Sequence, residues 1–231
     1  MIERIKNELV LSGSPEKAKI LAGFFKTGKG EYGEGDVFLG VTVPEQRRIA
    51  KKYVEISVEE LENLLSSKVH EHRLTALLIL VEKYKKYDSK NKEKVARFYL
   101  ENRRHVNNWD LVDLSADKIL GDYIYDKDKK ILYNLAKSKN LWERRISIIS
   151  TFNLIKRNDF EDALKISKIL LNDEHDLIQK AVGWMLREIG KRDQKAEEDF
   201  LKKYRKTMPR TMLRYAIERF GENRKRFYME R

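Results

Sequence analysis

The feature that most constrains the fold is a helical repeat of apolar residues that runs through most of the chain. Leu74, Leu77, Leu78, Val81 and Tyr84 stand at positions i, i+3, i+4, i+7 and i+10, so they form one apolar stripe on a helix. Only three of the 231 residues are proline and 37% are charged, which favours amphipathic helices over a β-sandwich. The sequence therefore predicts an all-α fold of about a dozen helices, without strand pairs.

Capping signals divide this pattern into separate helices. Ser14 before Pro15 predicts a helix start, and Ser57 to Glu60 has the spacing of a capping box. Asn108 is a predicted cap for a helix that begins at Trp109. Glycine and proline predict the remaining boundaries: Gly121 ends the helix that begins at Trp109, Gly190 ends the helix through Trp184, and Pro209 and Gly221 bracket the last helix.

Helices joined by short polar turns form either a bundle or a solenoid of helical hairpins. The three tryptophans, Trp109, Trp142 and Trp184, stand in similar helical settings 33 and 42 residues apart, near the period of HEAT-type repeats. No shift in composition marks an internal linker. We therefore expect residues 1–231 to form a single domain.

Composition excludes several classes of site. The chain has no cysteine, which excludes disulfides, a thiol nucleophile and cysteine-ligated zinc. The four histidines, His70, His72, His105 and His175, have no carboxylate cluster near them in the sequence, so we expect neither a metal site nor a cofactor. No window approaches 18 uncharged apolar residues, and the N-terminal MIERIKNELVLSGS lacks the pattern of a signal peptide. These features predict a cytoplasmic protein that is not bound to a membrane.

The charge balance points to an anionic partner. Lysine and arginine outnumber acidic residues by 49 to 37, which gives a net charge of +12. A basic surface of this kind binds nucleic acid by displacing counterions from phosphates. The alternative is a Lys/Glu-rich surface of the thermophile type, whose excess charge only aids solubility.

The stretch KTGKGEYGEGDVFLG contains a GxGxxG pattern at Gly28, Gly30 and Gly33. A dinucleotide site requires a strand before the first glycine and a helix directly after the last. Here a predicted helix precedes the glycines and GDVFLGVTVP follows them, so nucleotide binding is disfavoured. We predict instead a flexible, glycine-hinged connection that the apolar cluster of residues 37–39 (Val, Phe, Leu) pins to the core.

The stretch NNWDLVDLSADKILGDY, residues 107–123, combines an aromatic residue with carboxylates. On a helix, Trp109 and Asp113 share a face, which continues through Ala116 and Leu120. An indole face beside a carboxylate can stabilise a cationic sugar. The alternative is a core tryptophan with a surface or capping aspartate. Asp110 lies in the first turn, where its charge favours the helix dipole, and we interpret it as structural.

Basic residues alternate with aromatic ones in three later helices. LWERR contains Arg144 and Arg145, adjacent residues that project about 100° apart on a helix. Interleaved basic and aromatic groups on successive helices are typical of a surface that binds duplex DNA, although each helix alone is equally consistent with solvated charges. The other members of this set are Arg187, Lys191 and Arg192 after Trp184, and Arg210 and Arg214 in the predicted last helix.

Together, NNWDLVD, LWERR and QKAVGWMLRE resemble the motifs of the AlkD-type DNA alkylation-repair family in order and spacing. GEGDVFLGVTVPEQRR resembles that family's N-terminal segment, with a longer glycine-rich insertion ahead of it. The resemblance covers most of the chain. It implies a monomeric α-α superhelix of HEAT-like repeats whose concave, basic face holds duplex DNA. It also implies hydrolysis of the N-glycosidic bond of cationic N3- or N7-alkylated purines, without metal or cofactor.

The resemblance also implies roles for single residues. It makes Asp113 the catalytic carboxylate, Trp109 and Trp184 the aromatic walls beside the deoxyribose, and Arg145 a contact to the DNA backbone. Thr42 and Val43 depart from the family pattern, which has a more polar pair there. Two alternatives stay open at this point: a relative that binds branched or damaged DNA without excising bases, and a helical-repeat scaffold for proteins.

Overall fold

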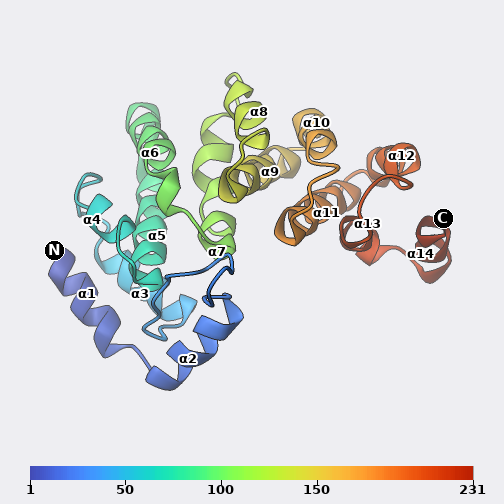
Figure 1. Cartoon of the computed structure of the whole chain (residues 1–231). Coiled ribbons are helices and arrows are strands. Elements are labelled where there is room, and N and C mark those ends of the chain that lie inside the picture. Colours follow the sequence, from blue (N-terminus) through green and yellow to red (C-terminus); the bar gives the residue numbers. More distant parts are fainter. Residues whose placement is uncertain (231) are drawn as a thin grey trace. The chain divides into compact units, whose positions relative to one another are not determined.

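The structure is a computed structural model that describes residues 1–230, and it is built from helices (Figure 1). Within these residues there is no strand, and a single parallel bridge joins Val37 to Val69. The predicted all-α fold is confirmed. The residues group into two compact units, Met1–Ser115 and a second unit that begins at Ala116. The single 1–231 domain and the concave basic face stay predictions.

The first unit is organised around its longest helix, α5. Residues 70–81 of α5 are all buried, because α3, α4, α6 and α7 pack around it and α1 contacts it from one end. The apolar stripe from Leu74 to Tyr84 is therefore core, as the sequence predicts. The helices of this unit are α1 (Ile2–Leu11), α2 (Pro15–Phe24), α3 (Val43–Lys52), α4 (Glu62–Leu65), α5 (His70–Lys86), α6 (Ser89–Glu101), the short η1 (Arg103–His105) and α7 (Trp109–Asp113).

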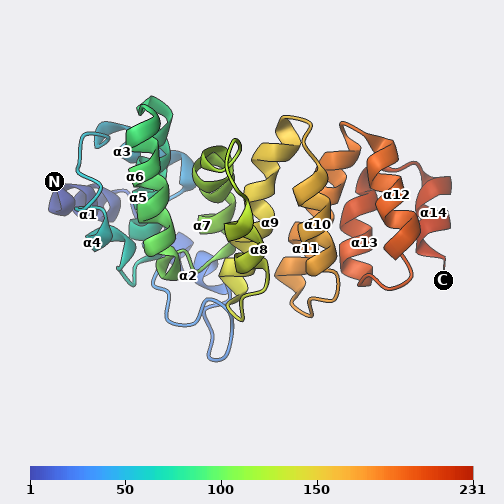
Figure 2. The same cartoon turned by 90° about the horizontal axis from the view of Figure 1, so that it is seen from above.

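The second unit is a stack of helical hairpins. Its π-helix η2, α9, α11 and α13 contact one another in succession, and α8, α10 and α12 pack against them as an outer layer (Figure 1). Seen from above, these pairs follow one another in chain order (Figure 2). The bounds are η2 (Asp117–Gly121), α8 (Lys130–Ala136), α9 (Leu141–Lys156), α10 (Glu161–Ile169), α11 (Asp176–Gly190), α12 (Gln194–Tyr204), α13 (Arg210–Ala216), η3 (Ile217–Arg219) and α14 (Glu222–Met229).

The predicted helix caps are largely present. The side chain of Ser14 accepts a hydrogen bond from the Lys17 N–H, and that of Asn108 accepts one from the Trp109 N–H. The reciprocal bonds of the Ser57–Glu60 capping box form, but they hold a turn that precedes α4 and not the start of a helix. Gly190 ends α11. The last helix is α14, which follows Gly221, so the prediction that Pro209 and Gly221 bracket the last helix is wrong.

The predicted continuous helix from Trp109 to Gly121 is also wrong. Helix α7 ends at Asp113, where the backbone tightens so that the Ser115 N–H bonds to the Val112 carbonyl at 3.1 Å. Ala116 and Leu120 are buried core residues of the second unit. Gly121 lies within η2, where a Cβ would come 2.3 Å from the Ser150 carbonyl oxygen, so close packing explains this glycine.

A buried carboxylate fixes the end of the glycine-rich connection. Glu71 is 1% exposed and accepts hydrogen bonds from three successive backbone N–H groups. The distances are 3.0 Å from Leu39, 2.8 Å from Gly40 and 3.2 Å from Val41. Phe38 is buried as predicted, but the Val37 side chain is 50% exposed, and Val37 holds the connection through its backbone bridge to Val69 instead. The Glu71 carboxylate therefore adds a polar anchor to the apolar one that the sequence predicts.

Glu197 in α12 should make stability depend on pH. It is 2% exposed, and burial raises its pKa from 4.5 to about 8. Because the folded state holds the proton more tightly, this contribution is complete below pH 4.5 and is lost as pH rises towards 8. The slope reaches about 1.4 kcal/mol per pH unit. Urea unfolding between pH 5 and 8 should show this loss in the wild type and a flatter profile in Glu197→Gln; equal slopes would contradict it.

Candidate functional site

The first unit contains an apolar cavity of about 550 Å³ next to α7. Helix α2 forms one wall, and no residue of α2 is buried in the core, so its apolar side chains Ile20, Leu21 and Phe24 face this space. Trp109, Asp110 and Asp113 of α7 also line the cavity. The remaining lining residues are Lys17, Phe25, Phe38, Gly40, Val41, Thr42, Val43, Pro44, Gln46, His70, Glu71, Leu74 and Leu114.

Aromatic rings pack against one another around Trp109 in the wall of this cavity. The Trp109 indole stacks on Phe25 with centroids 5.0 Å apart and 14° between planes, and it meets Phe24 edge-on at 5.8 Å. Phe25 stacks in turn on Phe38 at 5.1 Å. The indole is half-buried, with one face against Phe25. Only the opposite face is then suited to a ligand, and the aromatic contacts fix its orientation.

The two aspartates of α7 have different surroundings. Asp113 is half-buried and lines the cavity. Asp110 is buried, and its Oδ1 accepts from the Leu111 N–H at 2.8 Å while its Oδ2 lies 2.8 Å from His70 Nε2. Both carboxylate oxygens of Asp110 are therefore engaged within the protein. A carboxylate on an apolar, aromatic wall attracts a cation more strongly than one in water, because the local dielectric constant is low.

His70 also belongs to this site, although no sequence motif predicts it. Its ring lies between two buried carboxylates, with Nδ1 3.1 Å from Asp36 Oδ2 and Nε2 2.8 Å from Asp110 Oδ2. Burial acts to lower the pKa of His70, but the bonds to Asp110 and Asp36 outweigh it and the pKa is raised. Burial acts to raise the pKa of Asp36, but His70 and Arg73, whose guanidinium lies 2.7 Å away, lower it.

In the second unit, Trp184 lies on α11 and is half-buried. Its indole N–H donates to Glu188 Oε1 at 3.2 Å, and its ring packs on Phe152 with centroids 5.7 Å apart. Glu188 also pairs with Lys191 and with Arg192, at 3.6 Å for the latter. Burial acts to raise the pKa of Glu188, but the bond from Lys191 lowers it. Lys191 and Arg192, two of the predicted DNA-binding residues, therefore pair with Glu188, the residue whose carboxylate orients Trp184.

The other predicted DNA-binding residues differ in how much of each side chain is exposed. Arg144 binds Asp173, with Nε to Oδ2 at 2.6 Å. Arg145 is 5% exposed and donates to the Leu177 carbonyl, which disfavours a direct phosphate contact. Arg187 pairs with Glu218. On α13, Arg210 is half-buried and Arg214 is exposed. Trp142 is buried, which agrees with a supporting role.

The amides of the GxGxxG pattern are already bonded to other groups. The Gly28 N–H donates to Glu31 Oε2 at 2.9 Å, and the Gly30 N–H donates to Glu34 Oε2 at 2.8 Å. The Gly33 N–H bonds to the Lys26 carbonyl at 3.0 Å. Carboxylates where a phosphate would bind repel an anion, which supports the interpretation of this stretch as a connection.

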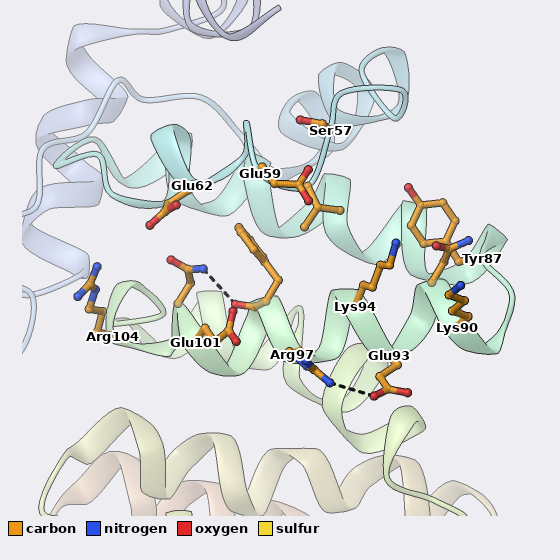
Figure 3. A pocket seen from close by; sticks show the side chains of 14 residues that line it. Ser57, Glu59, Glu62, Tyr87, Lys90, Glu93, Lys94, Arg97, Glu101 and Arg104 are labelled. Atoms are coloured by element: carbon orange, nitrogen blue, oxygen red, sulfur yellow. Dashed lines mark hydrogen bonds and ion pairs between the residues drawn. The ribbon is translucent and has the colours of Figure 1, made fainter.

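A second, larger cavity in the first unit has a different character. It encloses about 950 Å³ between α6 and the turn at residues 57–62 (Figure 3). Acidic and basic side chains alternate along it, and Arg97 pairs with Glu93 at 3.1 Å. This mixture selects no single class of ligand. Within residues 1–230 no group of three or more His, Asp and Glu side chains is placed to hold a metal ion.

No helix in the described part of the chain combines the length and apolar character that a membrane crossing requires.

Comparisons with known proteins agree with the sequence motifs. The model of a family described as DNA alkylation repair enzyme matches residues 5–220. A solved structure described as a predicted DNA alkylation repair enzyme from Enterococcus faecalis is similar with a TM-score of 0.69 and 18% identity, covering 91% of this chain and 98% of that one. AlkD2 from Streptococcus mutans is similar with a TM-score of 0.55 and 17% identity, covering 90% and 98%. The comparison with curated proteins gave no match. At these identities the structural similarities establish the fold.

Proposed function

We propose that this chain, which belongs to the DNA alkylation repair enzyme family, is a DNA glycosylase that removes cationic N3- or N7-alkylated purines from duplex DNA. The observation that carries the proposal is the placement of Trp109 and Asp113 together on the wall of one apolar cavity. The alternative of a core tryptophan beside a surface aspartate predicts no such cavity.

The chemistry needs little more than charge stabilisation. Alkylation at N3 or N7 leaves the base positively charged, so the base departs without a general acid. The sugar becomes oxocarbenium-like as the C–N bond breaks, and a carboxylate beside it stabilises that charge, as in glycosidases. Asp113 serves this role and orients the water that attacks C1′. The base leaves as a neutral molecule with the bonding electrons of the C–N bond, the water oxygen bonds to C1′, and the proton that this water loses passes to the surrounding solvent.

The tryptophans supply aromatic surface next to the sugar. The indole face of Trp109 that is not stacked on Phe25 attracts the developing cation through its quadrupole. Trp184, which the sequence resemblance assigns as a second aromatic wall, is oriented by Glu188. In this proposal both tryptophans contact the sugar and neither contacts the base. Selection of the damaged base then depends on the positive charge that the base itself carries. We further propose that the protein acts as a cytoplasmic monomer and needs neither metal nor cofactor.

Duplex DNA is held by exposed basic residues of the second unit. Arg214 is exposed, and Lys191 and Arg192 keep part of their charge accessible beside Glu188. Arg144, Arg187 and Arg210 belong to the same predicted set, and the burial of Arg145 makes its role one of support for α9 and α11. The net charge of +12 gives a second candidate, a protein that binds branched or damaged DNA without cutting out bases.

Binding and base release, measured on the same duplexes, separate these functions. The affinity for a methylated duplex should fall about 10²-fold or more between 50 and 200 mM salt, because phosphate contacts release counterions. Release of 7-methylguanine or 3-methyladenine should accompany binding. Binding to branched DNA without release would favour the non-catalytic alternative, and an affinity that does not change with salt would favour a protein scaffold.

A further inference from the structure

We infer that His70 is a positioning residue that aligns α7, and with it Trp109 and Asp113, for the reaction. This inference rests on the proposed function and adds a residue that touches neither the sugar nor the base. It follows from the bonding of the His70 ring and from the aromatic rings packed around it.

The geometry requires both ring nitrogens of His70 to act as donors. Nδ1 lies 3.1 Å from Asp36 Oδ2, and Nε2 lies 2.8 Å from Asp110 Oδ2. Ionised carboxylates only accept hydrogen bonds, and a neutral imidazole has a single N–H, so only the imidazolium serves both. The protonated ring therefore links the connection before α3, through Asp36, to α7, through Asp110.

Asp110 carries this link directly to the candidate catalytic pair. It stands next to Trp109 in the first turn of α7 and three residues before Asp113. Because α7 has only five residues, few of its own hydrogen bonds fix its orientation. The neighbouring cap is tied to the same anchor, since Asn108 Nδ2 lies 3.5 Å from Asp36 Oδ2. A shift of α7 would move the carboxylate and the indole together.

A second contact path runs through the rings. His70 stacks on Phe38 with centroids 4.6 Å apart, and it contacts Phe25 at 4.9 Å. Phe25 carries the stacked face of Trp109 at 5.0 Å. His70 thus contacts Phe25, which packs on the Trp109 indole. It also contacts Asp110, which lies on the same short helix as Asp113.

The rate of base release should therefore depend on whether His70 is protonated. The charged groups that face its ring are Asp36 from the connection, Arg73 from α5 and Asp110 from α7, and the same cavity is lined by Lys17, Glu71 and Asp113. The two carboxylates raise the pKa of His70 against the effects of burial and Arg73. The protonated ring then persists to higher pH than a free imidazole, and one of the two bonds is lost as pH rises through the raised pKa.

His72 provides a matched control. It is a buried histidine of the same helix, but its Nδ1 bonds to Ser67 at 2.9 Å and the charges near it are Glu3, Lys6 and Arg73. Replacing His70 or His72 by glutamine therefore makes the same chemical change in α5. Only His70→Gln removes the positive charge and the second ring donor that together join Asp36 to Asp110.

The test measures single-turnover base release against pH for wild type, His70→Gln and His72→Gln, after subtraction of spontaneous loss. We expect the rate constant at saturating protein to fall at least about tenfold in His70→Gln. The protein concentration that gives half-saturation should not change. The decrease of the rate constant at alkaline pH, expected for the wild type, should be absent from this variant. His72→Gln should keep both. If His70→Gln does not fold, Asp110→Ala replaces it, because it removes the oxygen that accepts from His70 Nε2 and leaves Asp36 in place. Unchanged rate and pH profile in a folded variant would overturn the inference.

Hydrogen exchange separates this inference from the proposed function. If the wild type releases no base, the proposed function fails. Hydrogen exchange of the α7 amides then still tests whether His70 holds α7 in place through Asp110. Faster exchange at Trp109 and Leu111 in His70→Gln than in His72→Gln would support the alignment of α7 by His70. Equal exchange would overturn it.

Discussion

Replacing Asp113 by asparagine should lower the single-turnover rate constant for base release about 10²- to 10³-fold, the range seen when one electrostatic stabiliser is removed from a transition state. Asparagine has nearly the same shape, so the walls of the cavity stay in place while the charge is lost. Asp113 lines the same apolar cavity as the Trp109 indole and is half-buried, so water screens its charge less than that of an exposed carboxylate. The affinity for intact methylated DNA should change little, because the charge that Asp113 stabilises develops only as the bond breaks.

Asp126→Asn is the matched control, since this exposed aspartate undergoes the same change outside the cavity. It should keep the wild-type rate constant. Both variants should keep the wild-type circular dichroism spectrum and unfolding midpoint. An Asp113→Asn protein that is folded, saturated with DNA and as fast as wild type would show that the carboxylate has no part in the chemistry.

Replacing Glu71 by glutamine should lower the free energy of unfolding by about 2–4 kcal/mol. The carboxylate accepts from the N–H groups of Leu39, Gly40 and Val41, and Glu71 is 1% exposed. Glutamine keeps one acceptor oxygen and places an NH₂ group against backbone N–H groups, which leaves buried donors unsatisfied. Urea unfolding at constant pH measures the change.

Glu59→Gln is the control for this prediction, because Glu59 is exposed on the turn before α4. Its free energy of unfolding should stay within about 0.5 kcal/mol of the wild type. A Glu71→Gln protein as stable as this control would mean that the three backbone N–H groups find other acceptors. The connection would then be anchored by Phe38 and its apolar neighbours.

The local parts of the fold were predictable because their causes lie close together in the sequence. The caps at Ser14 and Asn108 each depend on a side chain and a backbone N–H within three residues. The apolar stripe of α5 depends only on helical spacing. The end of α7 was not predictable from spacing, because apolar residues continue at helical positions beyond Asp113 while the backbone leaves the α-helical pattern at residues 114 and 115.

The surroundings of the candidate site depend on residues far apart in the sequence. His70 meets Asp110 across 40 residues and Asp36 across 34, and nothing in the local sequence of any of the three indicates the pairing. The aromatic face of Trp109 was predictable from its position relative to Asp113, but the stacking of Phe25 on the indole was not. Burial of Arg145 was equally hidden, because adjacent arginines are distinguished only by which helix packs against them.

The most direct test of the account is the rate at which wild-type protein, in excess over a duplex with one 7-methylguanine, releases the free base. We expect first-order release far faster than spontaneous loss, with an abasic site left in an uncut strand. Release no faster than from DNA alone, with the duplex fully bound, would contradict it.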